Sequence, residues 1–347
     1  MQRRHFIALA VGTLATAATA GSGLLPGRAA AATAKDGIDA AAWHRLRRFV
    51  PTRFGDIACI DHGQGEAALF LHGFPLNSFQ WRGAIERLAR YRRCIAPDFL
   101  GLGHSEVADG QDLAPREQVA MLVAVLDRLG IDRVDVIAND SGGQAAQLLV
   151  AAHPQRVRSL LLSNCDSEIN SPPAAMAPVI ELARENRWVD EWIVPWHADP
   201  VLARSDAGIG AMCYADPGHP GDEAIAAYFS PLIASPRRKA LANAYAVALA
   251  RNPLTGIGPR LASCGVPTRI VWGMADTIFA PADADHLDRA FDRSRGVRRL
   301  PGYKLFWPEE RPDVIAAEAL ALWGLEADDA GVGSLSRPAT ATGTPPR

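Results

Sequence analysis

The stretch VDVIANDSGG, residues 134–143, decides the fold. Its β-branched start predicts a buried strand, and its small residues at the end predict an abrupt turn into a helix. Such a turn crowds the backbone, so it requires small residues two positions before and two after the residue at its tip. Ala138 and Gly142 occupy these positions around Asp140. The stretch therefore predicts a nucleophile elbow with a carboxylate at its tip, and an aspartate there attacks carbon and forms an ester.

Two other interpretations of the same residues remain. Ser141 can be taken as the nucleophile, flanked by Asn139 and Gly143. That frame ranks second because it lengthens the strand by a residue and places a bulkier side chain where close approach is needed. In the other, Asn-Asp-Ser-Gly-Gly is only a turn, because all these residue types favour turns.

Composition limits the kinds of protein this chain can be. Its 347 residues are 48% hydrophobic and 21% charged, with a formal net charge of -2. That is enough apolar material for one large core, and there is no basic excess of the kind that binds nucleic acid. The five cysteines are odd in number and widely spaced, which favours buried small hydrophobic residues over disulfides. With no ligand cluster and no phosphate-binding glycine loop, we expect neither a metal nor an organic cofactor.

The two ends of the chain differ from the middle. Residues 1–34 begin with Arg3-Arg4, continue through a weakly apolar run and end in Ala32-Thr33-Ala34, which predicts a twin-arginine-type export signal. We therefore expect a periplasmic or secreted protein with no stable membrane anchor after signal cleavage. Residues 326–347 contain almost no large apolar residue after Leu335, which predicts a disordered tail.

Between these ends, short strand patterns alternate with amphipathic helices. Such alternation predicts an α/β fold with a mostly parallel sheet flanked by helices. We expect residues 35–170 and 262–325 to form this core. Residues 171–261 interrupt the alternation with helical sequence rich in Trp and Pro, and this segment predicts an insertion.

At this point the chain resembles the α/β-hydrolase superfamily. The resemblance spans nearly all of residues 49–325 and rests on four motifs in the same order as in that family. The motifs are Leu71-His72-Gly73-Phe74-Pro75, Pro97-Asp98 with Gly101-Leu102-Gly103, the elbow at Asp140, and Trp272-Gly273-Met274-Ala275-Asp276. The resemblance implies an α/β-hydrolase fold in which residues 171–261 form the helical cap. An aspartate at the elbow is similar to the haloalkane dehalogenases and epoxide hydrolases.

The resemblance also implies roles for particular residues. The backbone amides of Phe74 and Ser141 are expected to form the oxyanion hole, where each donor is worth on the order of 3 kcal/mol. Asp276 is the leading candidate for the acid that orients a catalytic base, and Asp166 is the other position from which related enzymes supply it. His72 is expected to brace its loop by hydrogen bonding.

The chain departs from the family near its C-terminus. When Glu310 and Pro312 are aligned with the family, Lys304 and Leu305 stand where a glycine and the catalytic histidine are expected. Loss of that base removes general-base help of roughly a hundredfold to ten-thousandfold. Candidate replacements are Asp276, Lys304, Tyr303, His197 and His219. Otherwise Asp140 acts as an acid or base in a lyase or isomerase reaction, or the protein binds a small molecule without turnover.

The substrate is defined only by class. The resemblance to dehalogenases implies a halide-binding tryptophan after the nucleophile, and often an asparagine in the His-Gly-x-Pro turn, but this chain has Ser141 and Phe74. Epoxide hydrolases use two cap tyrosines to protonate the epoxide oxygen, and Tyr214, Tyr228 and Tyr245 lie in the predicted cap. These tyrosines can equally pack the cap or line an apolar pocket, like Trp188, Trp192 and Trp196. We therefore expect a small apolar substrate, an epoxide first and a haloalkane second. No pattern indicates an oligomeric state.

Overall fold

A nine-stranded sheet forms the centre of the protein. The computed structural model describes residues 38–325, and the predicted export signal and disordered tail lie outside them. The strand order is β1-β2-β4-β3-β6-β7-β8-β9, with β5 pairing β2. Only the pairs that involve β2 are antiparallel, so the predicted mostly parallel α/β sheet is confirmed. The strands are β1 (Arg47–Thr52), β2 (Gly55–His62), β3 (Ala67–Leu71), β4 (Arg93–Pro97), β5 (Glu106–Val107), β6 (Val134–Asp140), β7 (Val157–Cys165), β8 (Thr268–Gly273) and β9 (Ser294–Leu300).

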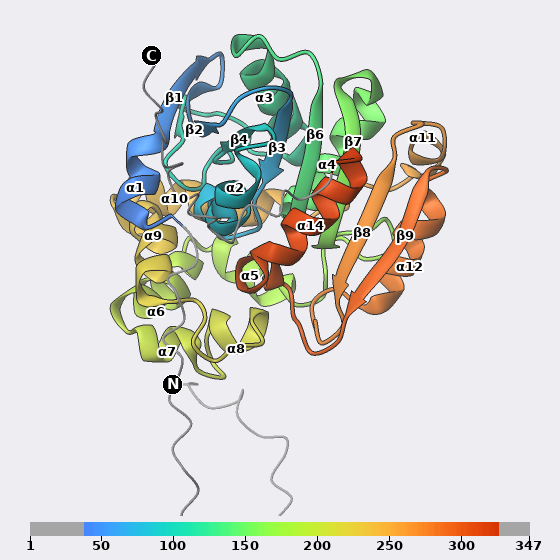
Figure 1. The fold of residues 1–347 in the computed structure, drawn as a ribbon. Coiled ribbons are helices and arrows are strands. Elements are labelled where there is room, and N and C mark those ends of the chain that lie inside the picture. The colour runs from blue at the N-terminus through green and yellow to red at the C-terminus, as the bar shows by residue number, and fades with distance from the viewer. Residues whose placement is uncertain (1–37, 326–347) are drawn as a thin grey trace, which may run out of the picture. The chain divides into compact units, whose positions relative to one another are not determined.

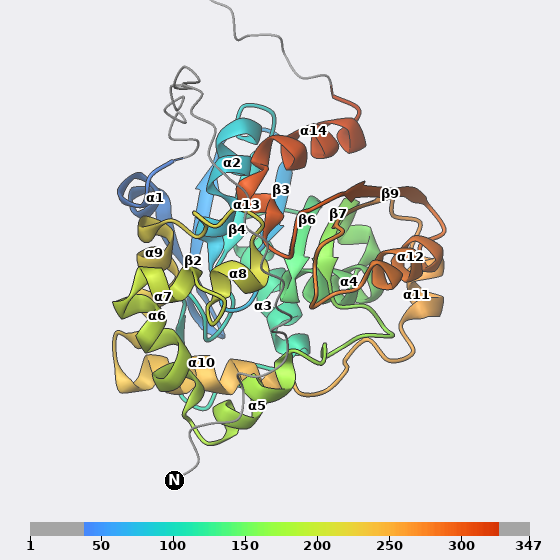
Figure 2. The same ribbon diagram turned by 90° about the horizontal axis from the view of Figure 1, so that it is seen from below.

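Helices cover both faces of this sheet (Figure 1). Figure 2 shows α2 and α14 on one face and α3, α4 and α12 on the other. The strands between them are buried on both sides, as parallel strands usually are. Outside the segment between β7 and β8, the helices are α1 (Ala40–Leu46), η1 (Ser78–Trp81), α2 (Arg82–Leu88), α3 (Pro115–Arg128), α4 (Ser141–Ala152), η2 (Pro154–Arg156), α12 (Pro281–Ala290), α13 (Trp307–Glu310) and α14 (Pro312–Trp323).

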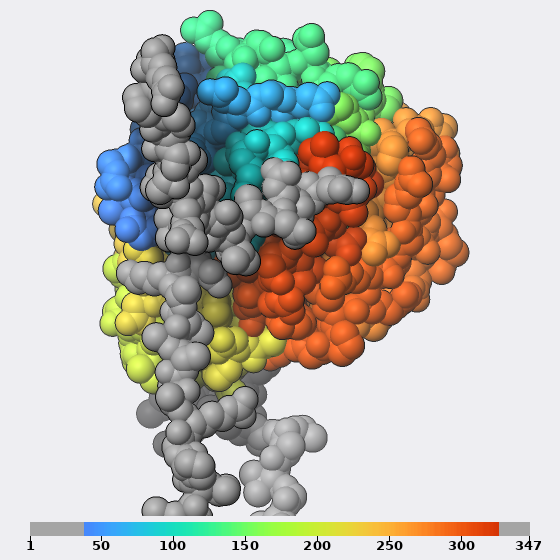
Figure 3. Space-filling view, viewed as in Figure 1, coloured from blue at the N-terminus to red at the C-terminus, as the bar shows by residue number. Residues whose placement is uncertain are grey.

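The chain between β7 and β8 is helical, and we call α5 to α11 the inserted helices. In the face shown by Figure 3, their yellow surface adjoins the red C-terminal helices. Among residues 38–325, no helix is both long and apolar enough to span a membrane. The inserted helices are α5 (Met176–Arg184), η3 (Val189–Ile193, a π-helical turn), α6 (Val194–Ala198), α7 (Pro200–Arg204), α8 (Ile209–Cys213), α9 (Asp222–Ile233), α10 (Pro236–Ala248) and α11 (Gly258–Ala262).

The turn from β6 into α4 is tight. Asp140 ends β6 with φ 54° and ψ -130°, a conformation that non-glycine residues rarely adopt. A Cβ added to Gly142 would lie 2.3 Å from the carbonyl oxygen of Leu71. At Gly143, an added Cβ would lie 2.3 Å from Cβ of Cys165. The strained residue is thus Asp140 rather than Ser141, and the small residues after it are required by close packing against β3 and β7.

A buried polar network joins the inserted helices to the core. Glu309 on α13 accepts hydrogen bonds at its Oε2 from the hydroxyls of Tyr214 and Tyr228, both at 2.8 Å. Its Oε1 accepts from Arg82 on α2 at 2.8 Å. The Glu309 side chain is 1% exposed, so water does not reach its carboxylate. Arg82 neutralises the charge of this carboxylate, and the two tyrosine hydroxyls supply the hydrogen bonds that water would otherwise make.

Replacing Gly142 with alanine tests the packing of the elbow. We expect Gly142→Ala to lower the free energy of unfolding by at least about 2 kcal/mol, because the new methyl group overlaps the backbone of β3. Gly221→Ala is the matched control, since a Cβ there meets no atom within 4 Å. Chemical denaturation of both variants measures the difference, and equal stability would contradict the packing argument.

Replacing Glu309 tests the buried network. We expect Glu309→Ala to cost about 3–5 kcal/mol of unfolding free energy, because it leaves the charge of Arg82 without its partner and two tyrosine hydroxyls without an acceptor. Glu185→Ala removes an exposed partner of Arg187 and should cost less than about 1 kcal/mol. Urea unfolding of the two variants gives the comparison, and a small loss for Glu309→Ala would mean that water enters the network.

Candidate active site

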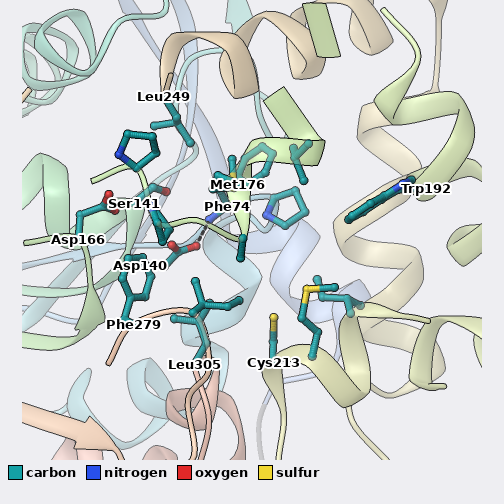
Figure 4. A pocket seen from close by; sticks show the side chains of 18 of the residues that line it. Phe74, Asp140, Ser141, Asp166, Met176, Trp192, Cys213, Leu249, Phe279 and Leu305 are labelled. Carbon is teal, nitrogen blue, oxygen red and sulfur yellow. Dashed lines mark hydrogen bonds between the residues drawn. The ribbon is translucent and has the colours of Figure 1, made fainter. Parts of the chain in front are cut away.

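A single apolar pocket lies where the carboxyl end of β6 meets the inserted helices (Figure 4). It holds about 710 Å³ of empty space, counting the part open to solvent. Three tryptophans expected either to pack or to line a pocket, Trp188, Trp192 and Trp196, do line it. An apolar pocket with a few polar groups is the usual form of a small-molecule site. The titratable residues that line it, within the described chain, are Asp140, Asp166 and Cys213.

Asp140 points into this pocket and is held by the backbone. Its Oδ2 accepts a hydrogen bond from the N–H of Phe74 at 2.7 Å, which is the dashed line in Figure 4. Burial raises the pKa of Asp140 well above its usual range, and the nearby carboxylate of Asp166 raises it further. The N–H groups of Phe74 and Ser141 favour the ionised form and oppose this rise. The two predicted oxyanion-hole residues thus both meet the carboxyl of Asp140.

The loop that carries Phe74 is braced from several sides. The Nε2 of His72 accepts from the N–H of Phe99 at 3.1 Å, while its Nδ1 lies 2.9 Å from the carbonyl of Gly73. Burial lowers the pKa of His72, so the ring is neutral and acts as the brace expected from the sequence. Gln80 accepts from the N–H of Gly73 at 2.9 Å and donates to Asn139 at 2.7 Å. The position of the Phe74 N–H therefore depends on hydrogen bonds that reach the elbow itself.

Asp276 lies behind the pocket and does not line it. Its carboxylate accepts from Nδ2 of Asn164 at 2.8 Å and from the N–H of Ile278 at 2.8 Å. Burial raises its pKa to about 6. Asn164 at the end of β7 is a residue that the sequence analysis missed, and its place on the strand beside β6 is the signal that could have found it.

Leu305 occupies the pocket wall at the position aligned with the missing histidine. Its side chain is 3% exposed, and its carbonyl accepts from Nδ2 of Asn139 at 3.1 Å. The loop is thus fixed beside the elbow, but it presents an apolar side chain there. The geometry gives no base at this position.

The candidate replacements for the histidine are placed elsewhere. Lys304 donates to the carbonyl of Ala211, and the hydroxyl of Tyr303 accepts from Arg311 at 3.2 Å. In the inserted helices, Nε2 of His197 lies 2.9 Å from the hydroxyl of Ser230. His219 stacks on Tyr214 with ring centroids 5.8 Å apart. Neither these four residues nor Asp276 lines the pocket.

The three candidate cap tyrosines lie in two different places. Tyr214 and Tyr228 donate to Glu309 in the buried network and do not line the pocket. Tyr245 stacks on Phe74 with centroids 5.6 Å apart, and its hydroxyl lies 3.5 Å from Oγ of Ser141. The structure brings only Tyr245 close to the elbow. The partner that engages the other two tyrosines lies far away in sequence, so the pattern of tyrosines alone did not indicate it.

Asp166 is the second carboxyl of the pocket. Its Oδ1 accepts from Gln144 at 3.3 Å, and the hydroxyl of Ser171 hydrogen bonds to its side chain. Burial raises its pKa to about 7, which the hydrogen bonds from Ser171 and Gln144 partly oppose. The sequence analysis named it as an alternative supporting acid, and the structure places it beside the nucleophile candidate rather than beside a histidine.

One buried donor in the pocket wall has no partner. The indole Nε1 of Trp188 makes no hydrogen bond in the described part of the protein. Its ring packs on Phe74 with centroids 4.9 Å apart. A buried unpaired donor is costly, and this one lies close to the residue whose N–H holds Asp140. Among residues 38–325 no cluster of His, Cys, Asp and Glu is arranged to hold a metal ion.

Comparison with known proteins agrees with this architecture. Residues 68–307 match the model of the alpha/beta hydrolase fold family. Haloalkane dehalogenase 2 of Mycobacterium bovis is 28% identical over 290 residues, covering 80% of this chain and 94% of that protein. An alpha/beta hydrolase fold protein from Burkholderia ambifaria superposes with a TM-score of 0.67 at 23% identity, over 80% of this chain and 97% of that one. The epoxide hydrolase CorEH superposes with a TM-score of 0.64 at 21% identity, over 80% and 98%.

The family match covers more than half of the sequence and contains the elbow, the Phe74 loop and Asp276. The two superpositions show the same fold over most of the chain. The chain therefore belongs to the α/β-hydrolase family and is a hydrolase of that fold, similar to haloalkane dehalogenases.

Proposed function

We propose that the protein hydrolyses a small apolar electrophile through an ester on Asp140. The observation that carries this proposal is the strained Asp140 at the elbow, with its Oδ2 held at 2.7 Å by the N–H of Phe74 in an apolar pocket. A carboxylate fixed in this way is oriented for attack on carbon. The same N–H groups lie where negative charge develops when the ester is later attacked.

An epoxide and a haloalkane are the two substrate classes that this chemistry serves. The sequence ranks the epoxide first because Ser141 and Phe74 stand where dehalogenases have a tryptophan and an asparagine, and because the predicted cap contains tyrosines. Glu309 engages Tyr214 and Tyr228, which weakens the second of these arguments.

Leu305 favours a second candidate function, in which the protein binds such a molecule and turns it over poorly or not at all. A lyase or isomerase reaction with Asp140 as acid or base belongs to the same group of alternatives, because it needs no water attack on an ester. None of these alternatives predicts an ester on Asp140.

We also propose that the protein acts after export. The support is the Arg3-Arg4 pair, the weakly apolar run after it and the Ala32-Thr33-Ala34 cleavage pattern. The small-molecule substrate would then be met in the periplasm or outside the cell.

Intact mass after incubation with panels of epoxides and bromoalkanes tests the nucleophile. We expect wild-type protein to gain the mass of one ester during turnover, and Asp140→Asn to gain none, because an amide does not displace these leaving groups. Peptide mapping should place the adduct on Asp140.

Ser141→Ala is the matched control, because it removes the rival hydroxyl and leaves the carboxyl of Asp140 and its hydrogen bond from Phe74 in place. Adducts that form on Asp140→Asn but not on Ser141→Ala would show that Ser141, and not Asp140, is the nucleophile. Neither adduct nor product with wild type would favour the binding, lyase or isomerase functions.

A further inference from the structure

Asp140 and Asp166 leave neighbouring strands at the same edge of the sheet. Asp140 is the last residue of β6, and its register partner on β7 is Cys165, which directly precedes Asp166. Both carboxyls line the pocket, where Figure 4 labels them together with Ser141. The parallel register of β6 and β7 thus places a second carboxyl next to the candidate nucleophile, in the same pocket.

We propose that Asp166 is the base that activates water against the Asp140 ester, in place of the histidine absent at Leu305. This inference rests on the proposed ester at Asp140. It differs from the roles that the sequence suggests, because Asp166 acts here on water itself and not through a histidine.

The hydrolysis step balances with water as the only co-reactant. The carboxylate of Asp166 accepts a proton from water while the water oxygen bonds to the ester carbonyl carbon of Asp140. The resulting oxyanion is held by the N–H groups of Phe74 and Ser141. As it collapses, the bond between that carbon and the alkyl oxygen breaks, and the leaving alkoxide takes the proton from Asp166. The product alcohol departs, and Asp140 returns to its carboxylate by losing its proton to solvent.

The surroundings of Asp166 suit this role. Gln144 and the hydroxyl of Ser171 hold its side chain, so the carboxyl is fixed at the pocket wall. A base works best when its pKa lies near the operating pH, and burial raises the pKa of Asp166 to about 7. No other carboxyl besides Asp140 lines the pocket within the described residues. The thiol of Cys213 lines it too, but burial raises the pKa of that thiol well above its usual range.

Asp166→Asn tests the inference with 1-bromobutane as the probe, because bromide leaves without a proton. We expect the variant to form the Asp140 ester at least as fast as wild type, because loss of the neighbouring carboxylate favours the ionised form of Asp140. We expect it to hydrolyse that ester at least about a hundredfold more slowly, so that the adduct accumulates. Asparagine keeps an oxygen to accept from Gln144, so the change removes the base and little else. Time-resolved intact mass gives both rates.

Asp283→Asn is the matched control. Asp283 is buried near Asp166 and is held by Ser167 at 2.6 Å and Asn170 at 3.0 Å, but it does not line the pocket. We expect Asp283→Asn to hydrolyse the ester as wild type does.

Wild-type hydrolysis in Asp166→Asn would overturn the inference, as would loss of hydrolysis in Asp276→Asn alone. A long-lived adduct on wild type would also overturn it while leaving the ester on Asp140 established, whereas no adduct and no product with wild type would contradict both proposals.

The pH dependence of adduct decay in wild-type protein is a second measurement, and it needs no variant to fold. A base must be ionised, so we expect decay to slow about tenfold per pH unit as pH falls below the pKa of Asp166 and to level off above it. The ester carries no charge, so this limb should lie at or below pH 7. Decay that does not change between pH 4 and 8 would overturn the inference, because burial keeps the pKa of Asp166 above the ordinary value of an aspartate. The titratable groups that act electrostatically on one or both of the two carboxyls are Asp276, Asp283, Cys165, Cys213 and Tyr245.

Discussion

The close approach of Gly142 to the carbonyl of Leu71 is the constraint on which the site depends. An added methyl group would lie 2.3 Å from that oxygen, so only glycine lets α4 start this close to β3. That proximity forces the positive φ of Asp140 and brings its carboxyl to the N–H of Phe74, which follows β3. Backbone strain of this kind persists only where packing over-determines it, and here two neighbouring strands do so.

Asn139 and Gln80 extend this constraint to the rest of the pocket. Asn139 donates to the carbonyl of Leu305 and accepts from Gln80, which in turn accepts from the N–H of Gly73. The elbow, the loop that carries Phe74 and the loop that carries Leu305 are therefore one hydrogen-bonded unit. The loop that would carry a histidine keeps its position with leucine in its place, so the frame of the site does not require the base.

Local rules predicted the elbow, whereas the rest of the site depends on distant partners. Small residues around Asp140 indicated the turn because crowding there is a property of a few neighbouring residues. The tyrosines could not be assigned in this way, since Tyr214 and Tyr228 are engaged by Glu309, whose place beside them follows from the packing of α13. The family resemblance named Asp166 and missed Asn164, and the place of both beside the elbow follows from the register of β7 against β6. The sequence thus predicted the sheet and the tight turn at Asp140 better than the contacts around that turn.

The electrostatics of the pocket connect the two halves of the proposed reaction. Two carboxylates close together in an apolar pocket resist being ionised together, and burial and Asp166 both raise the pKa of Asp140. When Asp140 becomes an ester, one of the two charges is removed, and Asp166 then ionises more easily. Attack by Asp140 would therefore prepare the base that the next step needs. A neutral histidine is not repelled by a charged nucleophile, whereas a carboxylate base is. A carboxyl can therefore take the place of the histidine where ester formation first removes the charge of the nucleophile.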